Sequence, residues 1–82
     1  MKIATIYNMG ISKQKKYLTN ILGHKVNEIV SRQILDTDTL YIRFRHHEVA
    51  YSNMYIKQVG PNIRHYLENF ETGELEPLEK EI

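Results

Sequence analysis

The fold is decided by one stretch, residues 36–45, which runs Asp-Thr-Asp-Thr-Leu-Tyr-Ile-Arg-Phe-Arg. Its first four residues are typical of a tight turn. From Leu40 onward, apolar and polar side chains alternate, which is the pattern of a strand with one buried face. The inward positions would be Leu40, Ile42 and Phe44. The stretch therefore predicts the turn and the second strand of a β-hairpin.

The segments on either side of this stretch extend the predicted sheet. Residues 26–35 suit a strand or a helical face, and their β-branched content together with the turn that follows favours a strand. Residues 51–59 again alternate and predict a third strand of an antiparallel sheet. The alternative for the first segment is one longer helix over residues 12–35, broken near Gly23.

The ends of the chain predict the remaining elements. Residues 2–7 are rich in β-branched and aromatic side chains and predict a strand. Residues 12–22 predict a helix that Ser12 would cap and Gly23 would end. Residues 63–70 place apolar side chains three and four positions apart, which predicts a short second helix. The resulting order is βαβββα, an α+β fold with an antiparallel sheet and the helices on one of its faces.

Charge is divided unevenly along the 82 residues, although the net charge is only +1. Residues 1–67 carry ten Lys or Arg against four acidic residues, whereas residues 68–82 carry one Lys against six Glu. We expect a single domain of residues 1–73 followed by an acidic C-terminal tail of residues 74–82, either exposed or held as a strap. A basic body suits an anionic partner, or simply a fold that neutralises itself.

Several kinds of site are not expected from this composition. There is no cysteine, hence no disulfide framework and no thiolate zinc site. The apolar runs are only a few residues long, which argues against a signal peptide and a membrane span, and a cytoplasmic protein is expected. No glycine-rich phosphate loop surrounds Gly10, so no cofactor is expected either.

The first candidate site is the outward row of the predicted hairpin, which consists of Tyr41, Arg43 and Arg45 and continues to His47. Alternate residues of a strand lie about 7 Å apart, comparable to successive phosphates. An aromatic ring beside guanidinium groups suits single-stranded nucleic acid or the carboxylates of an acidic protein. The alternative is a solvated face whose arginines pair with Glu28, Glu48 or the tail.

The second candidate is the lysine cluster at the start of the predicted first helix, formed by Lys13, Lys15 and Lys16 and extended by Lys25. Free backbone N–H groups and the helix dipole favour an anion at such a position. The alternative is an ordinary solvated helix face.

The histidines are the candidate residues for metal binding and for catalysis. In His46-His47-Glu48, adjacent side chains of a strand would point to opposite faces, and a zinc site needs three or four ligands. Because His24 and His65 lie in unrelated segments, no metal site is expected. Metal-free RNA cleavage would use His47 with Arg43 and Arg45, and more remotely Tyr55, Arg64 and His65.

Aromatic and acidic side chains give the last two candidates. Tyr51, Tyr55 and Tyr66 are the candidate interface aromatics. The glutamates of the C-terminal segment are Glu71, Glu74, Glu76, Glu79 and Glu81. They would fold back across the arginines, mimic nucleic-acid phosphates, or serve only solubility.

These observations favour a non-catalytic binding protein whose partner is nucleic acid or a protein that handles it. One concrete form is an inhibitor from a phage or mobile element that blocks a host nuclease or defence complex, an anti-CRISPR-like role. The first alternative is a small metal-free ribonuclease of the toxin type. The second is a homodimeric interaction module, because a thin core gains from self-association.

Overall fold

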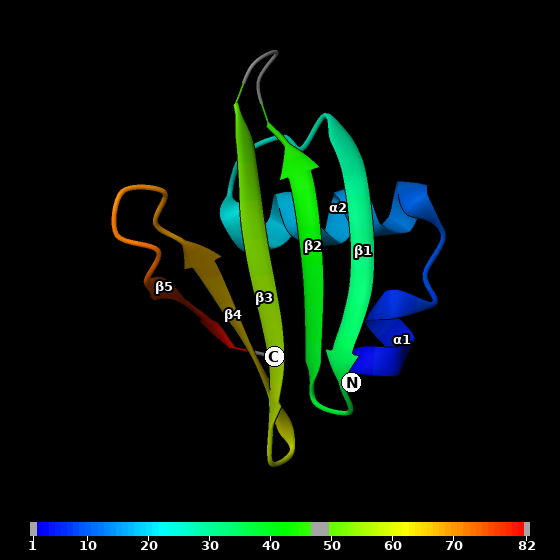
Figure 1. Cartoon of the computed structure of the whole chain (residues 1–82). Coiled ribbons are helices and arrows are strands. Elements are labelled where there is room, and N and C mark those ends of the chain that lie inside the picture. The colour runs from blue at the N-terminus through cyan, green and yellow to red at the C-terminus, as the bar shows by residue number, and fades with distance from the viewer. Residues whose placement is uncertain (1, 47–49, 82) are drawn as a thin grey trace.

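Two helices precede five strands in this protein, and the computed structural model describes residues 2–46 and 50–81, with the side chains of residues 79–81 excepted. The elements are α1 (Ile3–Tyr7), α2 (Ile11–Leu22), β1 (Glu28–Asp36), β2 (Thr39–Arg45), β3 (Tyr51–Val59), β4 (Asn62–Glu68) and β5 (Leu75–Glu81). Each strand pairs antiparallel with the next, so the sheet order is β1-β2-β3-β4-β5 (Figure 1). The α+β class is confirmed, and the predicted order βαβββα is corrected to ααβββββ.

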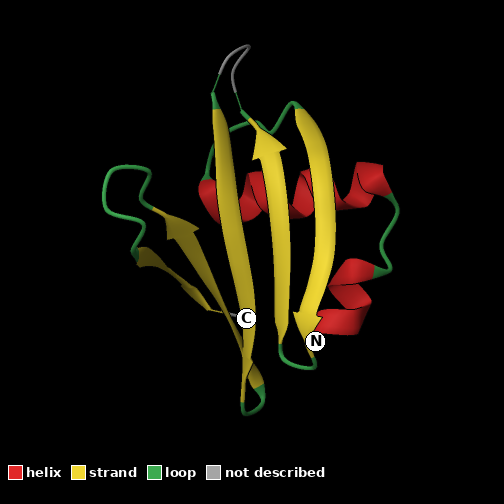
Figure 2. Ribbon diagram, in the orientation of Figure 1, coloured by secondary structure: helices red, strands yellow, loops and turns green. Residues whose placement is uncertain are grey.

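The helices cover one face of the sheet and leave the other face open. In Figure 2, α2 runs across the strands behind β1, β2 and β3, and α1 lies beside it near the end of β1. The sheet curves so strongly that both of its edge strands, β1 and β5, contact α2. The inner face of the sheet therefore wraps around α2, and the outer face is the broad surface turned toward the viewer in Figure 1.

The core lies between this curved sheet and the helices. Its sheet residues, each no more than 1% exposed, are Leu40, Ile42, Phe44, Met54, Ile56 and Ile63. The helices contribute Ile3, Ile6, Leu18 and Ile21, and Val26 joins them from the α2–β1 connection. The inward positions predicted for residues 40–44 are thus confirmed, since burial of one strand face requires this alternation.

The strand predicted for residues 2–7 is wrong, because this segment forms α1. Its buried side chains, Ile3 and Ile6, lie three positions apart and share one helix face. The fully buried Gln14 of α2 donates hydrogen bonds from Nε2 to the backbone oxygens of Ile6 (2.8 Å) and Tyr7 (3.2 Å). Tertiary contacts therefore outweigh the local β propensity of these residues.

The helix predicted for residues 63–70 is also wrong, because residues 62–68 form β4. Apolar spacing suited a helix, but Ile63 and His65 are both fully buried, which is the alternation of a strand. Gly60, with φ of 60°, makes the tight turn from β3 into β4. Pairing with β3 then satisfies the backbone of this segment.

The other expected elements are confirmed with small changes. α2 ends at Leu22 and is followed by Gly23, whose φ of 80° is left-handed, as expected. Its N-cap, however, is Gly10, and no side-chain hydrogen bond caps it, that of Ser12 included. Residues 26–35 provide most of strand β1, and the Asp36 carboxylate accepts the Asp38 backbone N–H at 2.8 Å in the predicted turn.

The acidic C-terminal segment supplies the edge strand of the sheet. β5 pairs with β4, and Leu78 packs partly buried against the core. No helix in residues 2–46 or 50–81 is long and apolar enough to cross a membrane.

Candidate functional site

A row of three tyrosines crosses the outer face of the sheet. The strand register places Tyr41 of β2 beside Tyr55 of β3, and Tyr55 beside Tyr66 of β4. The ring centroids of Tyr41 and Tyr55 lie 5.2 Å apart, with the ring planes tilted by 48°. All three side chains are partly exposed. The row therefore offers adjacent aromatic surfaces, which we call the tyrosine row.

A hydrogen-bonded network holds one end of the tyrosine row. Asn53 Oδ1 accepts hydrogen bonds from the Tyr41 hydroxyl at 2.7 Å and from Arg43 Nη1 at 3.0 Å. Asn53 Nδ2 donates to Glu68 Oε2 at 2.8 Å. This side-chain chain spans β2, β3 and β4 and fixes Tyr41 and Arg43 before any partner arrives.

Cationic side chains flank the tyrosine row on both sides. On one side, the Arg43 guanidinium carbon lies 5.1 Å from the centroid of the Tyr51 ring. On the other, Lys57 Nζ lies 5.5 Å from the centroid of the Tyr66 ring. Such contacts are favourable and leave charge available at the edge of the aromatic surface.

Arg45 is partly neutralised, as the solvated-face alternative required. Its Nη2 lies 3.1 Å from Glu28 Oε2 in a salt bridge that joins β2 to β1. The side chains of Arg45 and Glu28 remain 26% and 52% exposed, so the pair is a surface ion pair of small energetic value. Of the predicted row, Tyr41 and Arg43 thus belong to the tyrosine-row network, Arg45 lies at its margin, and His47 falls outside the described residues.

Burial raises the pKa of Tyr55, and the nearby charge of Glu68 and the phenol of Tyr41 raise it further. A tyrosine is neutral at physiological pH even without this shift, and the raised pKa keeps Tyr55 neutral in more alkaline solution as well. The centre of the row is then an uncharged aromatic ring that can contact a polyanion without repulsion.

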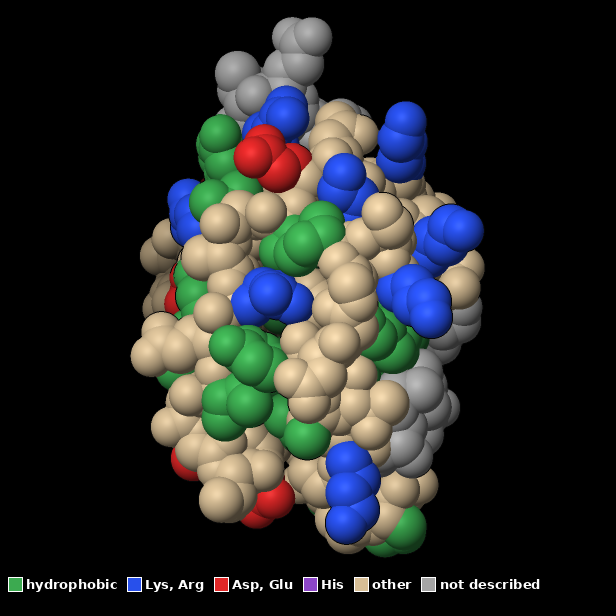
Figure 3. Space-filling view, turned by 90° about the vertical axis from the view of Figure 1, so that its right-hand side faces the viewer, with side chains coloured by type: hydrophobic (Ala, Val, Ile, Leu, Met, Phe, Trp, Pro, Cys, Tyr) green, Lys and Arg blue, Asp and Glu red, His purple; other side chains and the backbone are tan. Residues whose placement is uncertain are grey.

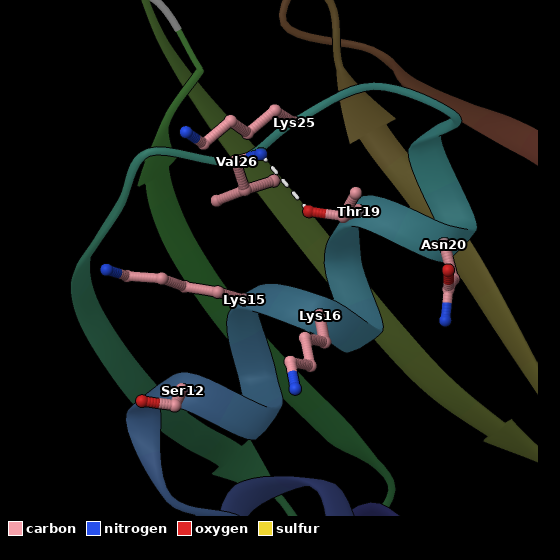
Figure 4. A pocket seen from close by; sticks show the side chains of 7 residues that line it. All are labelled: Ser12, Lys15, Lys16, Thr19, Asn20, Lys25 and Val26. Carbon is pink, nitrogen blue, oxygen red and sulfur yellow. Dashed lines mark hydrogen bonds between the residues drawn. The ribbon is translucent and has the colours of Figure 1, made fainter.

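The predicted lysine cluster lies on the opposite, helical side of the molecule. Lys15 and Lys16 line an open hollow of about 400 Å³ together with Lys25 from the α2–β1 connection. The other lining residues are Ser12, Thr19, Asn20 and Val26 (Figure 4). Lys13 does not belong to this lining. The cluster is therefore divided between a hollow and the exposed remainder of α2.

The helical layer is basic throughout. Residues 1–27 contain five Lys and no Asp or Glu. Figure 3 turns the β1 side of the molecule to the viewer, with the helices toward the right, and blue Lys and Arg atoms outnumber red acidic ones on this face. The uneven charge seen along the sequence is thus also uneven in space.

The three described histidines are His24, His46 and His65, and His47, the main candidate for catalysis, falls outside the described residues. His65, a remote candidate for catalysis, is fully buried on the inner face, where its Nε2 lies 2.6 Å from the Tyr17 hydroxyl. It cannot reach a substrate on the outer face beside Arg43. His24 and His46, expected to be unrelated, have ring centroids only 5.3 Å apart. In the described part of the chain no group of three or more potential metal ligands occurs.

The described part of the C-terminal segment does not lie over the predicted arginine row. β5 lies beyond β4 and is separated from β2 by two strands, β3 and β4, so its backbone does not fold across Arg43 or Arg45. Glu71 and Glu74 are exposed, and Glu76 Oε1 accepts a hydrogen bond from Asn69 Nδ2 at 3.3 Å. Glu79 and Glu81 have only their backbone described.

Sequence reasoning missed three members of the site: Asn53, Lys57 and Glu68. Asn53 and Lys57 alternate with the tyrosines of β3 and were detectable as members of its outward face. Glu68 could not be recognised as a partner of Asn53, because residues 63–70 were assigned to a helix. No family model matches this sequence, and comparison with curated proteins and with solved structures found no match.

Proposed function

We propose that this protein is a non-catalytic binding protein that holds single-stranded nucleic acid on the outer face of its sheet. The observation that carries the proposal is the alignment of Tyr41, Tyr55 and Tyr66 on three adjacent strands. Sheets bind single strands through exposed aromatic rings on which bases stack, and each stacked base contributes about 1–3 kcal/mol.

The arrangement of charge supports the same partner. Arg43 and Lys57 flank the aromatic row, and their positive charge would attract the phosphates of a strand whose bases stack on the rings. Glu28 neutralises the neighbouring Arg45, and Glu68, which accepts a hydrogen bond from Asn53, adds a negative charge to the same face. We therefore expect modest affinity in which stacking matters as much as electrostatics.

A second candidate is an acidic protein partner, and the Asn53 network favours it. Interfaces between proteins are enriched in Tyr and Arg side chains held in fixed geometry. Arg43, fixed by Asn53 at 3.0 Å, would bind a carboxylate with little loss of side-chain entropy.

Fluorescence anisotropy with labelled single-stranded DNA and RNA, and with a duplex of the same sequence, tests the first candidate. We expect the single strands to bind more tightly than the duplex. Tyr66→Leu, which removes the ring but keeps an apolar side chain, should weaken binding about tenfold. Tyr66→Phe keeps the ring and serves as the matched control, with unchanged affinity.

Salt titration separates stacking from charge. Arg43→Gln should reduce the dependence of log affinity on log salt by about one phosphate contact. Equal affinity of Tyr66→Leu and the natural protein would remove the tyrosine row as a base platform. A protein captured from lysate whose retention is insensitive to nuclease and sensitive to Arg43→Gln would favour the second candidate.

A further inference from the structure

We infer that the hollow lined by Lys15, Lys16 and Lys25 is a separate binding site for a small organic phosphate. It lies on the helical side of the sheet, whereas the tyrosine row lies on the outer face. The inference therefore stands independently of the nucleic-acid surface proposed above.

The hollow is built by two segments that are fixed to each other. Thr19 Oγ1 of α2 accepts a hydrogen bond from the Val26 backbone N–H at 3.2 Å, drawn as the dashed line in Figure 4. Val26 is only 3% exposed and anchors the α2–β1 connection in the core. Lys25 is thereby held next to α2, and the volume of about 400 Å³ is within the range of small-ligand sites.

Charge in the hollow is of one sign. Three of its seven lining residues are lysines and none is acidic. The acidic residue next along the chain, Glu28, lies 3.1 Å from Arg45 in a salt bridge. In Figure 4, Lys15 and Lys25 extend toward the same side of the view, whereas Lys16 extends downward. Their ammonium groups would all attract an anion that binds in the hollow.

The other lining groups indicate the class of ligand. Lysine ammonium groups bind phosphate as point charges, and the hydroxyls of Ser12 and Thr19 can donate to phosphate oxygens. Val26 and the aliphatic stems of the lysines add apolar surface, which an inorganic ion would leave unused. A phosphate ester with a compact organic group, such as a nucleoside monophosphate, uses both parts.

Heteronuclear NMR titration of the full-length protein tests this site, with pyrophosphate, adenosine monophosphate and adenosine as the probes. We expect saturable shifts of the Thr19, Asn20 and Val26 amide signals with both phosphates and none with adenosine. Lys15→Gln and Lys25→Gln should each weaken adenosine monophosphate binding about fivefold or more. Lys13→Gln removes the same charge from the same helix outside the hollow and should leave affinity unchanged.

Two results would overturn the inference. One is the absence of saturable shifts at these amides in a protein whose spectrum is otherwise that of a folded chain. The other is equal weakening by Lys13→Gln and Lys15→Gln, which would mean diffuse attraction to a basic helix. Neither result depends on the tyrosine row, because the nucleic-acid assay reads Tyr66 and Arg43 separately.

Discussion

The hydrogen bond between Tyr17 and His65 links α2 to the inner face of β4 across 2.6 Å. His65 is fully buried, and burial raises the pKa of Tyr17 to about 12. A neutral tyrosine is therefore part of the folded state well above neutral pH. Neither residue is apolar, yet together they fill the space between α2 and the sheet. The sequence pattern had placed each of them on a helix, Tyr17 on residues 12–22 and His65 on residues 63–70.

Stability should fall at high pH because of Tyr17. The folded protein keeps the phenol proton up to pH of about 12, whereas the unfolded chain releases it near pH 10. The stability that the buried Tyr17 phenol contributes is thus fully present below pH of about 10 and is lost as pH rises to about 12. We expect Tyr17→Phe to lower the free energy of unfolding by about 1 kcal/mol at neutral pH and to lose less stability above pH of about 10. Urea unfolding followed by circular dichroism measures both, and parallel pH profiles of the two proteins would contradict the assignment.

Among the elements, β2 and β3 were predictable because their alternation is unbroken and each has one buried face. α1 and β4 were not, since their local patterns are ambiguous and distant contacts decide them. The side chains of Gln14 and Arg32 satisfy the backbone oxygens at the end of α1, with Arg32 Nη1 donating to Tyr7 at 3.0 Å. No pattern within residues 2–7 reports these partners. The tyrosine row was not predicted because residues 63–70 were assigned to a helix. The row forms only when Tyr66 lies on a strand beside Tyr55.

β5 is held to the rest of the fold by its pairing with β4 and by Leu78. A segment that served only solubility would tolerate loss of an apolar side chain, whereas Leu78 packs against the core. We expect Leu78→Ala to lower the free energy of unfolding by about 1–2 kcal/mol, since its side chain is partly buried. The control is Glu74→Gln, which changes charge at an exposed position and should leave stability within about 0.5 kcal/mol. Equal denaturation midpoints for the natural protein, Leu78→Ala and Glu74→Gln would mean that β5 contributes no stability and serves only solubility.

For the whole molecule, the two sheet edges determine whether copies associate. β5 carries Pro77 and Glu76, which discourage a further strand. β1 has irregular pairing near residues 29–31 and 34–36, and such bulges also discourage edge pairing. Against this, Val30 is 44% exposed and Leu35 47% exposed on β1, so this edge is the one open to a partner.

We expect the chain to be a monomer at micromolar concentration. A bulged strand lacks the regular row of free N–H and C=O groups that a second strand needs, and this should outweigh the exposed apolar side chains of β1. Light scattering coupled to size exclusion should then give a mass near 9.7 kDa. Twice that mass would establish the homodimer instead. In that case Val30→Lys should restore the monomer if the β1 edges pair, while Glu76→Lys, a charge change on the opposite edge, should not.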